Sequence, residues 1–92
     1  MIKTFRHKGL KELFENGKSK LVAADLAKRL KRQLDFLNAA QNEQDMNLPG
    51  YRLHELKGER EGTWSVTVNG NWRPTFQFEG TDATDVDLEE YH

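Results

Sequence analysis

A chain of 92 residues without cysteine is long enough for one domain around a single core, but it excludes disulfides, thiolate metal sites and a cysteine nucleophile. It has no apolar run long enough to span a membrane, and the N-terminal stretch MIKTFRHKG lacks the apolar segment of a signal peptide, so a cytoplasmic location is expected. The net charge of −1 argues against a protein that coats polyanions, although residues 1–34 carry ten basic and three acidic residues while residues 62–92 carry one basic and six acidic residues.

Two helices are predicted in the N-terminal half, after a short first strand at residues 2–5. The first helix should cover residues 9–16 and end at Gly17, because glycine readily adopts the left-handed conformation that terminates a helix. Ser19 is placed to cap a second helix over residues 20–41. The apolar stripes at a spacing of three or four are Leu10, Leu13 and Phe14 in the first helix and Val22, Ala23, Leu26, Leu30, Leu34, Leu37 and Ala40 in the second.

The C-terminal half is predicted to be an antiparallel meander. Strands are expected at residues 51–57, 63–68, 72–78 and 83–91, separated by glycine-containing turns and a charged connection at residues 57–62. Two helices followed by such a meander indicate a single α+β domain over residues 1–92, with both helices packed on one face of a small, mainly antiparallel sheet.

The turn at Asn69-Gly70 decides which side chains face the core. A two-residue Asn-Gly loop would place the apolar residues of the two flanking strands on opposite faces of the sheet. A loop with an odd count, with Gly70 or Asn71 in the left-handed conformation, removes this conflict. We therefore predict that Val68 lies near Trp72, Val66 near Pro74 and Trp64 near Phe76. The opposite, polar face would then carry Ser65, Thr67, Arg73, Thr75 and Gln77.

Arg73 is the chemically most informative residue of this polar face, because a guanidinium group is always charged and matches the geometry of phosphate. It fits either an anion site or a surface ion pair with a carboxylate. His54, Lys57, Arg60 and Tyr91 are expected around the same uncovered face, in a hollow shared with Arg73. Aromatic, basic and imidazole groups around a sheet suit single-stranded RNA, whose 2′-hydroxyl is a ready nucleophile.

Metal-free cleavage of RNA needs a base, an acid and positive charge at the phosphorus, and His54, Lys57, Arg73, Tyr91 and His92 are sufficient in kind. Each also has a structural alternative. His54 fits a locally hydrogen-bonded strand residue, and Tyr91 fits a residue that closes the core. Lys57 and Arg60 fit loop charges that pair with neighbouring glutamates, and His92 fits a frayed terminus. The three histidines show no metal-ligand spacing, so no metal site is predicted.

Three segments together carry a resemblance to a known family: MIKTFRHKGLKELFENG at the start, LHELKGEREGTWSVTVNGNWRPTFQF in the middle and DLEEYH at the end. The combination of LKG-x-R-x-G-x-W-S, N-x-x-W-R-x-x-F and a terminal Tyr-His resembles the HigB toxins. These belong to the RelE superfamily of bacterial type II toxin–antitoxin systems and are also called plasmid maintenance killer proteins. The resemblance covers essentially the whole chain and implies a RelE-like fold.

The resemblance also implies an activity and partners. HigB toxins are ribosome-dependent endoribonucleases that enter the decoding site of the 70S ribosome, cut messenger RNA there without a metal or cofactor, and arrest growth until a HigA-type helix-turn-helix antitoxin neutralises them. On the matching motifs His54 and Lys57 would be catalytic and Arg73 would stabilise transition-state charge, with Arg60 binding RNA. Glu90, Tyr91 and His92 would share the base, acid and RNA-orienting roles.

Three positions depart from the family pattern. Glu90 stands where aspartate is frequent, and Asn69 stands where some members carry arginine. Pro74 directly follows Arg73 and removes a backbone donor, so an unpaired or irregular point is expected there.

Two other functions remain open on the residues alone. The first is a catalytically inactive module that binds an antitoxin-type repressor or the ribosome. The second is a DNA-binding protein that acts through its basic helices, against which the short first helix and the net acidic charge both argue.

Overall fold

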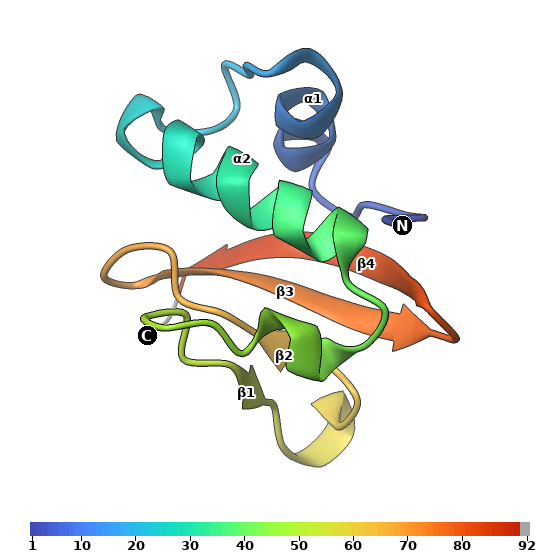
Figure 1. Cartoon of the computed structure of the whole chain (residues 1–92). Coiled ribbons are helices and arrows are strands. Elements are labelled where there is room, and N and C mark those ends of the chain that lie inside the picture. The colour runs from blue at the N-terminus through green and yellow to red at the C-terminus, as the bar shows by residue number, and fades with distance from the viewer. Residues whose placement is uncertain (91–92) are drawn as a thin grey trace.

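Two helices lie on one face of a four-stranded antiparallel sheet in the computed structural model, which describes residues 1–90 (Figure 1). The elements are α1 (Lys8–Asn16), α2 (Ala24–Ala39), the short 3-10 helix η1 (Glu43–Met46), β1 (His54–Glu55), the 3-10 helix η2 (Gly58–Arg60), β2 (Trp64–Ser65), β3 (Trp72–Glu79) and β4 (Asp82–Glu90). The strands follow one another in the sheet in chain order. The predicted α+β class is confirmed. None of the helices within residues 1–90 has the length and apolar character needed to cross a bilayer.

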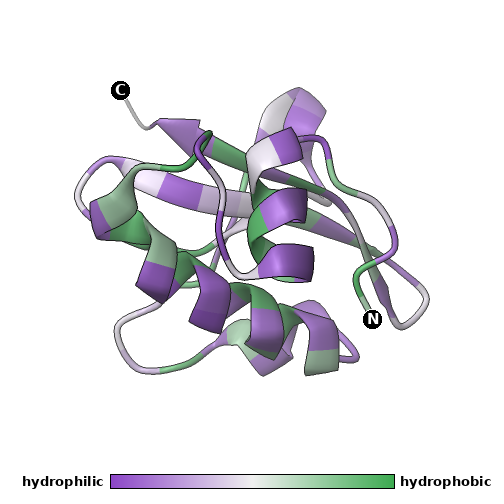
Figure 2. Cartoon of the chain, turned by 90° about the horizontal axis from the view of Figure 1, so that it is seen from above, coloured by the Kyte–Doolittle hydropathy of each residue, from purple (hydrophilic) through white to green (hydrophobic). Residues whose placement is uncertain are grey.

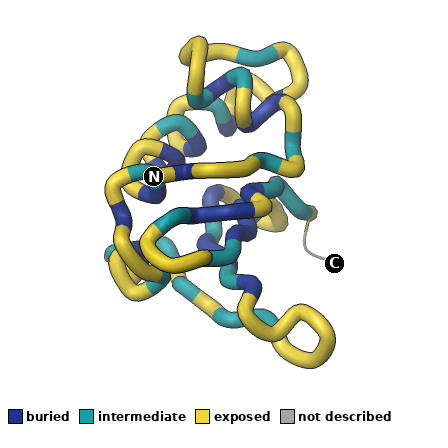
Figure 3. Tube along the Cα trace, turned by 90° about the vertical axis from the view of Figure 1, so that its right-hand side faces the viewer, coloured by how far each residue is buried: buried dark blue, intermediate teal, exposed yellow. Residues whose placement is uncertain are grey.

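The core lies between the helices and the sheet, where the buried residues gather (Figure 3). Apolar and polar residues alternate along both helices, so that each helix turns one stripe inward (Figure 2). The centre of the core consists of Leu10, Leu13, Leu30, Leu34, Leu37, Met46, Val66, Phe76 and Val86, each 1% exposed or less. The predicted stripes are therefore confirmed, except that Ala23 is exposed.

The boundary between the two helices differs from the prediction. Gly17 ends α1 as expected, with a left-handed φ of 80° and its N–H on the Leu13 carbonyl. Ser19, however, does not cap α2: its hydroxyl donates to Glu12 at 2.7 Å and accepts from the Leu21 N–H at 3.0 Å. Residues 20–23 form a turn, and α2 begins only at Ala24. The apolar pattern continued into this turn because Val22 is buried there without being helical.

The odd loop between β2 and β3 is confirmed. Gly70 takes the left-handed conformation with φ 49°, and the Val68 N–H donates to the Trp72 carbonyl at 3.1 Å. The Val66 N–H donates to the Pro74 carbonyl at 3.1 Å. Because proline has no N–H to return this bond, the ladder breaks at Pro74, and β2 ends at Ser65 instead of Val68. The predicted first strand of the meander is likewise reduced to the two residues of β1.

The N-terminal segment runs parallel to β4, where the sequence predicted a strand. It forms two isolated bridges, Ile2 to Ala83 and Phe5 to Val86, and not a continuous strand. Between these bridges β4 has an irregular point at Asp85, whose φ is 52° and whose N–H donates to the Thr4 hydroxyl at 2.8 Å. This irregularity shifts the register against β3 between Thr75 and Gln77, as a bulge does.

Candidate functional site

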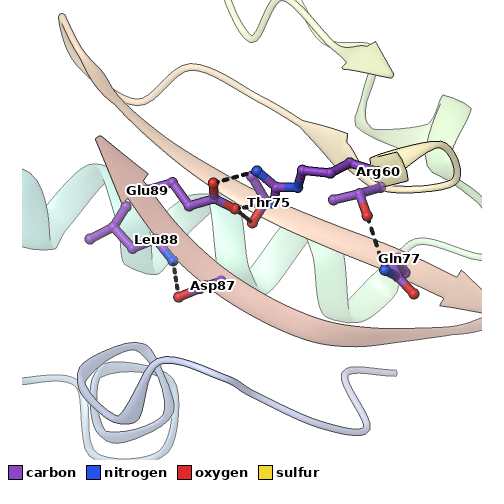
Figure 4. Close-up of polar contacts among 7 residues, drawn as sticks. Arg60, Thr75, Gln77, Asp87, Leu88 and Glu89 are labelled. Carbon is purple, nitrogen blue, oxygen red and sulfur yellow. Dashed lines mark hydrogen bonds and ion pairs between the residues drawn. The ribbon is translucent and has the colours of Figure 1, made fainter. Parts of the chain in front are cut away.

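The polar face predicted from the hairpin register exists, and it lies on the side of the sheet away from α2 (Figure 4). Direct cross-strand partners share a face, so one row runs across all four strands. This row is His54, Ser65, Thr75 and Asp87. The next row is Arg73 opposite Glu89, two positions along the same strands. His54 and Arg73 therefore project from the same face, from two different strands.

An ion pair occupies the middle of this face. The Arg60 guanidinium from η2 reaches across to Glu89 on β4, and its Nη1 lies 2.7 Å from the Glu89 Oε1 while its second terminal nitrogen meets the other oxygen (Figure 4). The Thr75 hydroxyl of β3 also donates to the Glu89 carboxylate, at 2.7 Å. The contact ties the exposed loop at residues 57–62 to the sheet, and Thr75 beneath it is only 1% exposed. This loop stands out at the bottom of Figure 3.

The electrostatics of this contact favour the ionised carboxylate. The hydrogen bond from Arg60 lowers the pKa of Glu89 to about 2, assisted by the Thr75 hydroxyl and by the charges of Arg60 and Arg73, whereas burial acts in the opposite direction. Glu89 is therefore negatively charged over the whole physiological range. Arg73 contributes because it lies directly across from Glu89 on β3, on the same face of the sheet.

Two cavities are lined by the sequence-predicted residues His54, Lys57 and Arg73. One, of about 410 Å³, is lined by His54 and Lys57 together with the chain that joins them and Glu61. The other, of about 240 Å³, lies at the hairpin turn and is lined by Arg73 with Arg52, Thr67 and residues 70–72. We call the second one the Arg73 cavity. Within residues 1–90 the expected single hollow is thus divided: His54 and Lys57 line one cavity, Arg73 lines another, and Arg60 lines a third of about 190 Å³ together with Thr75 and Glu89.

The remaining predicted residues lie differently. Arg60 pairs with Glu89 and not with the neighbouring Glu59 or Glu61. Glu90 lies opposite Trp72, one position beyond the Arg73 row, so its side chain starts from the other side of β4. Tyr91 and His92 lie outside the described residues, so their catalytic roles stay predictions. No group of three or more metal-ligating side chains occurs in the part of the chain that the structure describes.

Sequence reasoning did not find the role of Glu89. The loop of Arg60 and the strand of Glu89 are 29 positions apart, and no local pattern links them. The available signal was the hairpin register, because it places Glu89 across from Arg73 on the polar face.

Comparison with known proteins decides the family. The model of the family described as "RelE-like toxin of type II toxin-antitoxin system HigB" matches residues 3–92. The chain belongs to this HigB toxin family. It is 48% identical to the Endoribonuclease HigB of Proteus vulgaris over 92 residues, which is the full length of both chains. It is 36% identical over 76 residues to the Toxin HigB-1 of Vibrio cholerae serotype O1 (strain ATCC 39315 / El Tor Inaba N16961), with 80% of each chain covered.

Membership of the HigB family confirms the resemblance and implies an antitoxin partner, since the family is defined by toxin–antitoxin systems. It also identifies which residues of the polar face belong to the family motifs. Of the motif residues in the LHELKG and NWR segments, His54 and Arg73 project from the face of the sheet that the helices leave uncovered, and Lys57 lines the same cavity as His54.

Proposed function

We propose that the chain is the toxin of a bacterial type II toxin–antitoxin system and acts as an endoribonuclease that cuts messenger RNA on the 70S ribosome. The single observation that carries the nuclease activity is the cross-strand register, which aligns His54 and Arg73 on the same face of a rigid sheet. The family match and the relative named Endoribonuclease HigB support it. Its substrate and the ribosome lie in the cytoplasm, where we expect the protein to act.

The proposed reaction uses the ribose 2′-hydroxyl as nucleophile. Its oxygen attacks the adjacent phosphorus after losing a proton to a base, the bond from phosphorus to the 5′-oxygen breaks, and an acid protonates the departing oxygen. The products are a 2′,3′-cyclic phosphate and a free 5′-hydroxyl. His54, Tyr91 and His92 supply the proton donor and acceptor, whereas Glu90, whose side chain starts from the other side of β4, is left without a proton-transfer role. The guanidinium of Arg73 stabilises the negative charge at phosphorus, and Lys57 holds the RNA backbone.

The ion pair between Arg60 and Glu89 prepares this site. It fixes the loop that carries Lys57 against the strand that faces Arg73. The positive charge of Arg60 also offsets the negative charge of Glu89, which would otherwise repel a phosphate beside Arg73. Arg60 then contributes to RNA binding by cancelling this charge and by facing the same side as the cavities.

Substitution of Arg73 tests the proposal. Arg73→Ala should lower the rate of ribosome-dependent cleavage by about 100-fold or more, the effect of removing one group that stabilises a developing oxyanion. Growth arrest after induction should disappear, while the far-ultraviolet circular dichroism stays that of the parent. Lys11→Ala, an exposed lysine on α1, is the matched control and should keep full toxicity.

Primer extension on transcripts after induction should map cuts within translated codons. Cuts in naked RNA alone would contradict ribosome dependence.

Harmless expression of the unaltered chain would contradict the nuclease activity and leave a binding module for an antitoxin-type repressor or for the ribosome. Coexpression with a HigA-type helix-turn-helix protein should restore growth and give a complex that copurifies.

A further inference from the structure

A second basic cavity lies where α2 passes over the β2–β3 turn and the loop that follows η1. Its volume is about 240 Å³, and α2 supplies three of its lining residues, Arg29, Arg32 and Gln33. Residues 49–51 and the segment of Thr67 and Val68 complete it. We call it the arginine cavity. In Figure 1 the start of α2, the β2–β3 turn and the loop after η1 all lie at the left of the view. No acidic residue is among the described residues that line it, so its charge is entirely positive.

Two polar side chains of the arginine cavity, those of Arg29 and Gln33, are held in place by hydrogen bonds. Arg29 donates to the Val68 carbonyl at 3.3 Å, and Gln33 donates through its Nε2 to the Thr67 carbonyl at 2.9 Å. The Tyr51 ring packs edge-on against Phe36, with 6.3 Å between the ring centroids. Burial raises the pKa of the Tyr51 phenol although the nearby Arg32 charge acts against this, so the hydroxyl remains a donor at neutral pH. A ligand would therefore meet groups that are already ordered, which lowers the entropy cost of binding.

Gln33, one of the residues that line the arginine cavity, carries an unused acceptor. The residue is only 6% exposed, and its Oε1 is buried without a hydrogen-bond partner among residues 1–90. The orientation of the amide is fixed, because its nitrogen is bound to the Thr67 carbonyl and a flip would bring two oxygens together. A buried acceptor without a donor is unfavourable, and such groups in native proteins call for a specific explanation. A ligand that brings a hydroxyl or amino donor would satisfy it.

The arginine cavity adjoins the Arg73 cavity. Thr67 lines both of them, and Arg52 of the Arg73 cavity directly follows Tyr51 of the arginine cavity. Four arginines thus line two adjoining cavities, Arg29 and Arg32 in one and Arg52 and Arg73 in the other. A positively charged groove of this kind suits the phosphodiester backbone of a single strand.

We propose that the arginine cavity binds a nucleotide of the RNA at a distance from the cut, with its phosphate on Arg29 and Arg32 and a ribose 2′-hydroxyl or base amino group donating to Gln33 Oε1. This inference rests on the proposed nuclease function and adds a subsite to it. The unused acceptor distinguishes RNA from a simple anion, because a fully ionised phosphate has no proton to donate. The continuity with the Arg73 cavity favours RNA over an acidic peptide.

Binding of a labelled single-stranded RNA octamer to the full chain tests the subsite. Arg73→Ala is present throughout to prevent cleavage, and fluorescence anisotropy is recorded over a range of salt concentrations. Arg32→Ala should weaken binding roughly tenfold, as expected for loss of a charge-assisted hydrogen bond. It should also reduce the slope of log K against log salt by about 0.7, the value for one phosphate contact on a single strand. Lys28→Ala removes the same charge from an exposed position of α2 outside the cavity and should leave both quantities unchanged.

Gln33 is tested by comparing RNA with DNA of the same sequence. The parent should bind RNA more tightly than DNA, and Gln33→Met should reduce this preference while leaving the salt slope unchanged, because it removes the acceptor but no charge. Equal losses in Arg32→Ala and Lys28→Ala would overturn the proposal, since they would show only a general attraction to positive charge. Displacement of the RNA by an acidic peptide at equal concentration would overturn it in favour of a protein partner.

Two further measurements separate the sources of the RNA and the two proposals. If Arg32→Ala lowers cosedimentation with ribosomes that lack messenger RNA, the bound nucleotide is ribosomal; if the loss requires messenger RNA, it belongs to the message. Both results support the subsite.

Should the chain with native Arg73 fail to cut messenger RNA while the effects of Arg32→Ala persist, the nuclease proposal falls and the subsite stands. If cutting persists and Arg32→Ala binds RNA like the parent, the subsite falls alone.

Discussion

Glu89 is the residue on which the order of the polar face depends. It accepts hydrogen bonds from a residue of the loop and from a residue of the adjacent strand, Arg60 and Thr75. The Arg60 side chain is 46% exposed and that of Glu89 is 25% exposed, so solvent screens part of the attraction. A fork-shaped contact of this kind contributes geometry more than energy. Its main effect is to fix where the loop at residues 57–62 stands relative to Arg73.

Replacement of this carboxylate should therefore change stability modestly and in a pH-dependent way. Glu89→Gln should lower the free energy of unfolding at pH 7 by about 1 kcal/mol, the upper end for a partly exposed ion pair. The pKa of Glu89 is about 2 in the folded chain against a reference value of 4.5. Its contribution is thus complete above about 4.5 and is lost as the pH falls toward 2, because the unfolded state takes up the proton first.

Urea denaturation of the parent and of Glu89→Gln between pH 2 and pH 7 measures this effect. The difference between the two curves should shrink toward the acid end. Glu79→Gln, an exposed carboxylate near the β3–β4 turn, is the control and should show no such pH-dependent difference. A constant difference at all pH values would mean that Glu89 acts through packing and not through its charge.

At the scale of elements, the β2–β3 hairpin sets the faces of the sheet. Its loop contains a bulge, and only Gly70 in the loop has a positive φ, of 49°. A side chain added at Gly70 meets no other atom within 4 Å, so the cost of substitution there is conformational and not steric. The hairpin is the point where a local preference controls the position of Arg73.

Gly70→Ala should accordingly destabilise the fold by about 1 kcal/mol, because alanine enters the left-handed region unfavourably. Gly70→Asn should cost less, since asparagine tolerates this conformation. Thermal unfolding of the two variants provides the measurement. Equal melting temperatures for both would show that backbone conformation at this position does not limit stability.

Local sequence patterns predicted the elements whose form is determined by residues close together in the chain. The stripes of α1 and α2, the glycine end of α1 and the odd loop at Gly70 all follow from spacing and backbone preference. The start of α2 could not be predicted, because Val22 is buried in a turn and extends the helical pattern beyond the helix. The short β2 follows from Pro74, which marked an irregular point in the sequence but not where the strand would end.

The candidate site divides in the same way. The hairpin register in the sequence predicted that Arg73 and Thr75 share one face, and the structure adds Glu89 directly across from Arg73. The pairing of Arg60 with Glu89 and the arginine cavity depend on how a loop and a helix pack on the sheet. Such contacts join residues distant in sequence, and periodicity carries no information about them.

At the scale of the whole molecule, the first residues are hydrogen-bonded to the last strand. The backbone N–H groups of Lys3 and Arg6 donate to the carbonyls of Ala83 and Val86, each at 2.8 Å. Thr4 lies 81 positions from its partner Asp85. Contacts of such long sequence separation slow folding, because a long loop must be closed before they form. The N-terminal segment thus joins the two ends of the chain in the folded structure.

Proline substitution tests this closure. Lys3→Pro removes the N–H that bonds Ala83 and should lower the free energy of unfolding by about 1 kcal/mol or more. Lys8→Pro is the matched control, because Lys8 is the first residue of α1 and His7 before it is already extended, with φ −95° and ψ 114°. Urea denaturation should separate the two variants. If both variants lose the same free energy of unfolding, the loss comes from introducing proline and not from removing the bond to Ala83.

The N-terminal residues that are hydrogen-bonded to β4 also affect how separate copies of the chain interact. β4 spans nine residues and is the longest strand, and an open edge of that length is a template on which further chains can aggregate. The N-terminal segment occupies that edge from Ala83 to Val86, and the acidic side chains of Asp87, Glu89 and Glu90 discourage pairing along the rest. At the opposite edge, β1 offers only two residues. Chains that lose the N-terminal segment should therefore polymerise before they unfold.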